Sequence, residues 1–403
     1  MGLTALAATG ICAMLGAAIN VIPFMIHRSV PGIGPWVLPA YVFAAVPALI
    51  AALAYAILAS AMPRAGGSYV YVSRALHPYL GFVASFSQWV GLSIAIGVVS
   101  YVLIPFLRDI ATAVGQVGLA TTLETGIVRV SLALAFLWTF VWVNLHGLKL
   151  YKNMLVPMMF LMFALGSVVI IAGFAFDHEQ FVVAVQAADN HAIPEGGEFP
   201  FRLGIFLAAA AVLFSSFIGF DSIAQAGGEA RNPHLSLPLA IGIAVVTVGT
   251  FYLLFTSAVY HAVPWRFVAE EALTQDLTAP GLLGYLLPTG WTVAIIAGAA
   301  VALINDLPAM LLAVSRLMFA WAEDGIFPRF VGSVHPTRHT PGVAIVLSGL
   351  MASAGILGSH LAGDFFLGVD ILVTAMLVNF LLMCASVVTL PHRNPELAAE
   401  VRV

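Results

Sequence analysis

The sequence predicts an all-α polytopic membrane protein, and two observations support that prediction. Of the 403 residues, 61% are hydrophobic and only 8% are charged, whereas a soluble domain carries roughly 25% charged residues. The apolar residues also fall into runs of about 20, the length that a helix needs to cross a bilayer. We therefore expect about ten transmembrane helices, with the lipid bilayer as their solvent.

Each expected span is an apolar run bounded by charged residues, prolines or glycine clusters. The first run continues past signal-peptide length and contains Asn20 and Pro23, so we keep it as a span. The eighth is longer than a bilayer requires, so its end, WAEDG, should project into water. The ten spans are expected near residues 4–27, 36–61, 81–107, 127–146, 153–176, 203–229, 237–262, 287–322, 342–360 and 366–390.

The basic residues set the expected orientation of the chain. An N-terminus inside the cell places ten Lys and Arg residues on the cytoplasmic side and five on the other, as the positive-inside rule requires. An even number of spans then brings the C-terminus to the same side. We expect a multi-pass protein of a cell membrane, the bacterial inner membrane in our interpretation, with both termini cytoplasmic.

Ten spans divide into two groups of five, and the odd number in each group makes the second group enter the membrane from the opposite side. This arrangement is an inverted repeat. The expected parts are a first repeat, an extracytoplasmic loop, a second repeat and a cytoplasmic tail, at residues 1–176, 177–202, 203–390 and 391–403. Small and polar residues interrupt the first span of each group, in LGAAIN at 15–20 and FIGFD at 217–221.

The interruption of the sixth span is the strongest candidate for a functional site. Gly219 and Asp221 fall where the middle of the membrane is expected. Unpaired backbone groups in lipid cost several kcal/mol each, so non-helical backbone at that depth is tolerated only where it lines a protein-walled, watered cavity. A broken helix of this kind marks a binding site. The alternative is that Gly219 is a helix-packing glycine and Asp221 a satisfied polar residue in a bundle.

Other classes of site find little support in the sequence. No basic tract or stacking aromatic array indicates nucleic acid as a partner. Cys12 and Cys384 lie in apolar runs and resemble core residues rather than a disulfide or a metal site. There is no ATP-binding loop of the G-x-x-x-x-G-K-[ST] kind.

Three long motifs occur in order along the chain. They are PRAGGSYVYVSRALHPYLGF from Pro63, IGFDSIAQAGGEARNPHLSLPLAI from Ile218, and SRLMFAWAEDGIFPRFVGSVHPTRHTPGVAI from Ser315. In these motifs the chain resembles the amino acid/polyamine/organocation superfamily, the amino acid permeases, over nearly its whole length. The resemblance implies a LeuT-like fold and a secondary active transporter or exchanger that moves an amino acid or related small amine by alternating access.

Two departures from the family pattern limit what the resemblance implies. Many members have about twelve spans where this chain has about ten, so the oligomeric state is left open. The family's first-span motif usually reads I-G-S-G-I, whereas this chain has Leu15-Gly16-Ala17-Ala18-Ile19. Ala18 adds a methyl group where bare backbone normally approaches the substrate. Which amine-bearing solute is carried is therefore not determined.

The resemblance implies a substrate site made mostly of main chain. Residues of the first break would offer N–H groups and positive helix dipole to a carboxylate, and those of the sixth span would offer carbonyls to an ammonium. Phe220 would close over the substrate. The expected residues are Gly16, Ala17, Ala18, Ile19, Phe214, Ser215, Phe217 and Phe220. The alternatives are close helix packing for the two alanines and a lipid-facing or core aromatic for Phe220.

A charge at mid-bilayer costs at least ~2.5–3.5 kcal/mol and is kept mainly for function. Asp221, Asp306 and Asp370 are the candidates. The resemblance puts Asn305 and Asp306 where sodium-coupled relatives of this fold hold an ion, and a buried carboxylate can also carry a proton. We expect these two residues and Asp221 to couple Na⁺ or H⁺, with no other cofactor or metal. Alternatively, Asp306 only hydrogen-bonds backbone freed by Pro308.

Charged residues at the cytoplasmic ends of two spans are expected to form a gate. Glu229 and Arg231 end the sixth span, and Arg316 and Asp324 end the eighth. Such pairs could break and reform during transport, although interfacial anchoring is the simpler alternative.

Two other functions remain open on the sequence. An intramembrane enzyme is one, because Asp221 and Asp306 are paired acids in a bundle, but no metal-type His/Glu spacing or G-x-S-x-G accompanies them. A non-transporting sensor with the same fold is the other. We expect a transporter and not an enzyme.

Overall fold

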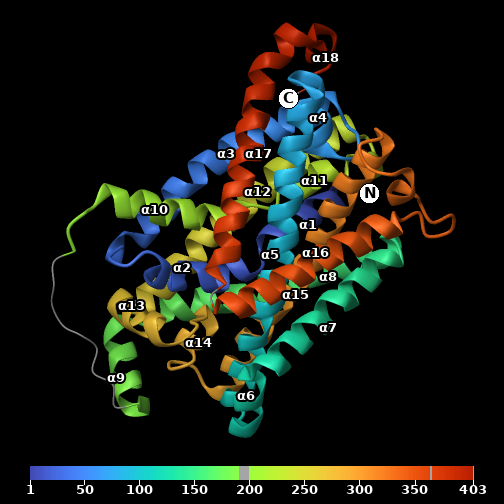
Figure 1. The fold of residues 1–403 in the computed structure, drawn as a ribbon. Coiled ribbons are helices and arrows are strands. Elements are labelled where there is room, and N and C mark those ends of the chain that lie inside the picture. The colour runs from blue at the N-terminus through green and yellow to red at the C-terminus, as the bar shows by residue number, and fades with distance from the viewer. Residues whose placement is uncertain (190–198, 364, 403) are drawn as a thin grey trace.

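The computed structural model describes residues 1–189, 199–363 and 365–402, and every regular element within them is helical. Among the described residues, nine helical segments are long and apolar enough to cross a membrane, and a tenth, shorter apolar segment covers Leu203–Phe217. The predicted all-α polytopic fold is confirmed: this is a multi-pass membrane protein. Figure 1 shows both chain ends in its upper half and α6, α9, α13 and α14 in its lower half.

The first half of the chain holds α1 (Leu3–Met14), α2 (Ala17–Ser29), η1 (Gly34–Trp36), α3 (Val37–Ala61), α4 (Gly67–Ala75), α5 (Pro78–Ala113), α6 (Val117–Glu124), α7 (Gly126–Leu145), α8 (Leu148–Ala175) and α9 (His178–Asp189). The second half holds α10 (Leu203–Phe214), η2 (Ser215–Phe217), α11 (Asp221–Gln225), η3 (Gly227–Glu229), α12 (Pro233–Ala262), α13 (Trp265–Thr274), α14 (Ala279–Leu283), α15 (Thr289–Glu323), η4 (Arg329–Gly332), α16 (Gly342–Ala362), α17 (Phe366–Arg393) and α18 (Pro395–Ala399).

The first span consists of two half-helices, as predicted. Between α1 and α2, Gly16 leaves the helical conformation, with φ −114° and ψ −123°. The break frees the carbonyl of Met14, which accepts hydrogen bonds from the Tyr252 hydroxyl of α12 and from the N–H of Gly16. The side chain of Asn20 donates to the Gly16 carbonyl at 3.4 Å. Polar partners therefore bind the Met14 and Gly16 carbonyls at the break, which lowers the cost of non-helical backbone at this depth.

The sixth span is also broken where the sequence predicts. After α10 and η2 the chain is non-helical until α11 begins at Asp221. Gly219 has a φ of +139°, a conformation that glycine adopts without a steric penalty. A Cβ atom at Gly219 would lie 2.3 Å from the carbonyl oxygen of Ala13. Glycine thus lets the sixth span approach the end of α1, so Gly219 both breaks its own helix and packs closely against another.

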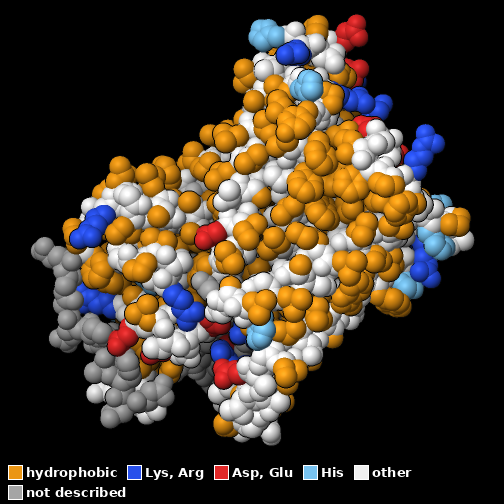
Figure 2. Space-filling model, viewed as in Figure 1, with side chains coloured by type: hydrophobic (Ala, Val, Ile, Leu, Met, Phe, Trp, Pro, Cys, Tyr) orange, Lys and Arg blue, Asp and Glu red, His pale blue; other side chains and the backbone are white. Residues whose placement is uncertain are grey.

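The two broken spans lie inside a frame of long helices. The first span packs on α12, α15 and α8, while α5 packs against α15, α16 and α17. The eighth span, α15, runs for 35 residues, and its end becomes exposed from Glu323 onward, as its length predicted. Figure 2 shows hydrophobic side chains across the middle of the molecule and charged ones mainly toward its ends, which suits a surface that faces lipid.

We predict that Gly219→Ala destabilises the fold by about 1–3 kcal/mol, because an alanine would have to adopt a strained φ and its methyl group would strike the Ala13 carbonyl. Thermal unfolding of the purified protein in detergent measures the effect. Gly242→Ala is the matched control, since Gly242 lies in α12 with no atom within 4 Å of a Cβ placed there. Equal melting temperatures for the two variants would show that the break tolerates a side chain.

Candidate functional site

A cavity of about 60 Å³ lies between the two broken spans and helices α5, α15 and α17. Because one water needs roughly 10–15 Å³ in such a measure, the cavity has room for a few waters or a small solute. Its wall is mostly apolar and includes Val98 and Val102 of α5 and Leu372 of α17. The polar side chains among its described lining residues are Ser215 and Asp306.

Asp306 is the one charged side chain in that lining, and it is only 4% exposed. The carboxylate abuts the break in the first span, because a Cβ atom built on Gly16 would lie 2.1 Å from Asp306 Oδ2. The other oxygen, Oδ1, is buried without a hydrogen-bond partner among the described residues. The structure therefore places Asp306 beside the first break with an unused acceptor.

Asn305 lies next to Asp306 in the sequence but contacts a different group. Its Nδ2 donates to the Sγ of Cys12 in α1 at 2.9 Å. Its Oδ1, like that of Asp306, is buried without a partner in the described part of the chain. Both residues thus keep a free oxygen near the first span, and oxygen is the ligand type that hard cations prefer.

Asp221 has a different environment, in which both carboxylate oxygens have partners. The side chain of Gln88 donates to Oδ2, and the N–H of Gly219 donates to Oδ1 at 3.1 Å. Gln88 in turn accepts hydrogen bonds from Ser68 at 2.5 Å and Gln225 at 3.1 Å. Asp221 does not line the cavity, so its contacts are those of a side chain that holds the broken segment in shape.

The aromatic residues expected in the substrate site pack in the core instead of lining the cavity. Phe220 is fully buried and stacks on Phe380, with ring centroids 5.4 Å apart. Phe217 lies against Tyr41 and Tyr252. These contacts match the alternative of a core aromatic for Phe220 in this conformation.

Of the expected sixth-span residues, Ser215 lines the cavity, whereas Phe214 does not. In the first span, Ile19 lines a second, smaller cavity of about 20 Å³ together with Asn20. The side chains of Ala17 and Ala18 lie outside what the structure describes, although their backbone begins α2.

At the end of the bundle that carries the chain termini, a buried ion pair joins the sixth and eighth spans. Arg316 binds Oε1 of Glu229 through Nη2 at 2.6 Å and Nε at 2.8 Å. The side chains are 6% and 23% exposed, respectively. Arg231 is exposed and pairs with neither in the described contacts. The ion pair therefore connects Glu229 of the sixth span to Arg316 of the eighth. Glu229 and Arg231, the two charged gate residues expected in the sixth span, do not pair with each other in the described contacts.

A second contact at this end links α4 to the eighth span. The hydroxyl of Tyr69 donates to Oδ2 of Asp324 at 2.7 Å. Burial raises the pKa of Tyr69, and the neighbouring Asp324 carboxylate raises it further. The tyrosine therefore stays protonated and keeps donating this bond at physiological pH.

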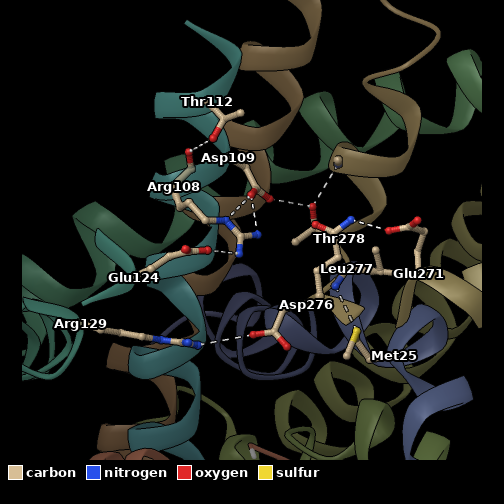
Figure 3. Close-up of polar contacts among 12 residues, drawn as sticks. Met25, Arg108, Asp109, Thr112, Glu124, Arg129, Glu271, Asp276, Leu277 and Thr278 are labelled. Carbon is tan, nitrogen blue, oxygen red and sulfur yellow. Dashed lines mark hydrogen bonds and ion pairs between the residues drawn. The ribbon is translucent and has the colours of Figure 1, made fainter. Parts of the chain in front are cut away.

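A group of six charged residues lies at the opposite end of the bundle, and we call it the distal cluster. Figure 3 shows Arg108, Asp109, Glu124, Arg129 and Asp276 of this cluster. Asp276, before α14, binds Arg28 of α2 at 2.9 Å and Arg129 of α7 at 3.7 Å. Arg108 of α5 binds its neighbour Asp109 at 2.7 Å and Glu124 of α6 at 3.1 Å. In the sequence, the arginines of this cluster indicated only the orientation of the chain, and nothing there indicated that these six residues meet. The cavity therefore lies between polar contacts at both ends of the bundle.

Comparison with known proteins agrees with the geometry. Residues 1–401 match the family model described as amino acid permease. Among curated proteins, the chain is similar to the branched-chain amino acid permease BcaP of Bacillus subtilis, with 27% identity across 90% of this chain and 75% of the relative. It is also similar to the low-affinity putrescine importer PlaP of Escherichia coli, with 24% identity across 85% and 69%.

A third relative is the human cationic amino acid transporter 4, with 27% identity across 85% of this chain and 53% of the relative. The chain thus spans about half the length of that relative. Its match to the family model nevertheless includes both broken spans and the cavity between them.

We predict that Glu229→Gln lowers stability by about 2 kcal/mol, because it leaves Arg316 buried without its anion. The loss should be smaller than for a fully buried pair, since the Glu229 side chain remains 23% exposed. Thermal unfolding of Glu229→Gln, Arg316→Gln and the double variant measures the coupling of the pair. Arg231→Gln is the comparison. If it destabilises as much as Glu229→Gln, the pairing across the spans is not the important contact.

Proposed function

Since the chain belongs to the amino acid permease family, we propose that it is a secondary active transporter or exchanger that moves an amino acid or a related small amine across the membrane by alternating access. The observation that carries this proposal is the cavity between two broken spans, with an acid in its wall whose Oδ1 has no partner among the described residues. Broken helices at mid-membrane put half-helix ends at a solute site. The names of the relatives, which cover amino acids and a polyamine, support the same class of solute.

For an amino acid substrate, we place the carboxylate at the start of α2 and the ammonium at the end of α10. The first turn of a helix has N–H groups without intrahelical acceptors and carries positive dipole. Gly16, Ala17, Ala18 and Ile19 supply that backbone. The carbonyls of Phe214, Ser215 and Phe217 would receive the ammonium, which is supported by the position of Ser215 in the cavity wall.

We assign ion coupling to Asp306, with Asn305 beside it. Both keep a buried oxygen without a partner among the described residues, and Asp306 contacts the break in the first span. A cation or a proton at Asp306 would therefore act directly on the segment that holds the substrate. Asp221 is the rival, but its carboxylate already accepts hydrogen bonds from Gln88 and Gly219.

The arrangement of the chain in the membrane belongs to the same proposal. We place both termini in the cytoplasm of a bacterial cell and treat residues 1–176 and 203–390 as inverted repeats. The pair Glu229–Arg316 then closes the cytoplasmic side, and the distal cluster closes the other. Alternating access would require each of these contacts to open in turn, and a Phe220 lid would have to leave its stack on Phe380.

Flux of radiolabelled amino acids and amines into liposomes that contain the purified protein tests this function. Solute uptake that follows an imposed Na⁺ or H⁺ gradient, or exchange with solute inside the liposome, is expected. Binding without flux would favour a sensor, and chemical conversion of the solute would favour an enzyme.

We predict that Asp306→Asn abolishes ion- or proton-driven concentrative uptake of an amino acid but leaves amino acid exchange largely intact, because exchange needs no net ion movement. If the proton is the coupling ion, the pH dependence of wild-type uptake should disappear in the variant. The same substitution at Asp221 is the control. Wild-type concentrative uptake by Asp306→Asn at every pH and sodium level would show that this acid is structural.

We predict that Ala18 limits the bulk of the solute at the anion-binding backbone. Ala18→Gly should tighten binding of α-amino acids or broaden the range that binds, because it removes the methyl group that distinguishes this chain from the family pattern. Ala18→Trp should block uptake. Binding assays with a series of amino acids compare the variants, and unchanged uptake by Ala18→Trp would place the substrate elsewhere.

A further inference from the structure

Asp306 lines the cavity and carries a buried acceptor oxygen that no described side chain neutralises. Oδ1 of this buried carboxylate has no partner in the part of the chain that the structure describes. Among the described residues, Asp306 interacts electrostatically with two titratable side chains, Cys12 of α1 and Tyr252 of α12. Neither is a cation, and both are engaged elsewhere, Cys12 with Asn305 and Tyr252 with the Met14 carbonyl. A buried anion without a counter-charge is costly, so the site favours a positively charged ligand.

The cavity has this one acid to share between two positive ligands. Among the described lining residues, Asp306 is charged, Ser215 is polar and uncharged, and the rest are apolar. Asp221 lies outside the lining and is held by Gln88. In a low-dielectric cavity a second unpaired charge is strongly disfavoured. A coupling cation and an ammonium group without its own carboxylate therefore cannot both be neutralised there.

An amino acid and an amine differ in the net charge that they bring into the cavity. A zwitterionic amino acid brings its own negative charge, so it can occupy the cavity while a cation sits on Asp306 and the total stays neutral. An amine that lacks the carboxylate brings only a positive charge. It is neutralised if it takes the place of the cation on Asp306.

We propose that a small apolar monoamine binds Asp306 directly through its ammonium and displaces the coupling cation, whereas an amino acid binds together with that cation. This inference rests on the proposed transport function and names its substrate classes. Amines are then exchanged for Na⁺ or H⁺, and amino acids are carried with it. No covalent step is involved, and one positive charge replaces another.

The shape and polarity of the wall restrict the rest of the amine. Val98, Val102 and Leu372 surround the cavity with hydrocarbon, which suits a short alkyl tail. A diamine would place its second ammonium against this wall, where no other described lining residue is an acid. The site should therefore prefer a monoamine to a diamine of the same length.

The test uses pairs of probes that differ only by a carboxylate, namely valine with isobutylamine, leucine with isoamylamine, and alanine with ethylamine. Binding to the full chain in nanodiscs is measured by calorimetry while Na⁺ is varied at fixed pH, and then while pH is varied without Na⁺. At a cation level ten times its own dissociation constant, competition should weaken amine binding about tenfold. Amino acid binding should stay the same or tighten. Butylamine should bind more tightly than 1,4-diaminobutane.

Two variants test whether the amine and the cation compete at Asp306. Asp306→Asn should weaken isobutylamine binding at least about 30-fold, as loss of a buried charge partner does, and should remove its cation dependence while valine still binds. Asp370→Asn is the matched control, because Asp370, the third mid-membrane acid that the sequence singled out, is exposed on α17 and is not among the residues that line the cavity. It should bind both probes as the wild type does.

The outcomes separate this inference from the proposed function. Wild-type binding of isobutylamine by Asp306→Asn would overturn the inference. If that variant does not fold, the wild-type titration decides, since amine binding independent of Na⁺ and pH would also overturn it. Amino acid binding with no amine binding would leave the transport function standing and reject the shared site. If the wild type binds neither member of any pair, the proposed function fails together with the inference.

Discussion

The need to satisfy backbone polar groups away from water is the constraint on which the rest of this structure depends. Two helices are interrupted in the middle of the bundle, and each interruption is repaired by a particular side chain. The Tyr252 hydroxyl binds the carbonyl that the first break frees, and Asp221 binds the N–H of Gly219 in the second. Because unpaired groups at this depth cost several kcal/mol each, these polar partners stabilise the breaks, and the breaks in turn open the cavity.

The charged residues of the chain differ in the partners that they contact. Asp221 accepts a hydrogen bond at each of its carboxylate oxygens, while Glu229 and Arg316 neutralise each other at one end of the bundle. At the other end, the acids and arginines of the distal cluster also neutralise one another, and Asp276 connects its loop to α2 and α7. Asp306 keeps a buried oxygen without a partner among the described residues. In a chain with so few charges, that leaves its negative charge available to a ligand.

In the proposed function, the contact between Asp306 and Gly16 would link ligand binding at the carboxylate to the conformation of the first span. The carboxylate lies where a side chain at Gly16 would otherwise be, so the eighth span fits into the gap between α1 and α2. A positive ligand at the carboxylate changes the electrostatic field at the break, where α1 ends with its negative dipole and α2 begins with its positive one. The same gap brings Gly219 against the Ala13 carbonyl, so the broken spans and α15 meet at one place and can respond together.

The sequence by itself determined the helical membrane fold, the approximate limits of the spans and the two breaks, because hydropathy, Gly219 and the Gly16 motif act locally along the chain. The motifs also indicated the family, and they singled out Asp306 as an acid in the eighth span. Only the tertiary structure decided which side chains meet. Gln88 binds Asp221 from a helix more than a hundred residues away, Glu229 pairs with Arg316 and not with Arg231, and Phe220 packs on Phe380. The valines of the cavity wall could not be predicted, because an apolar residue in a membrane helix has the same sequence signature whether it faces lipid, another helix or a cavity.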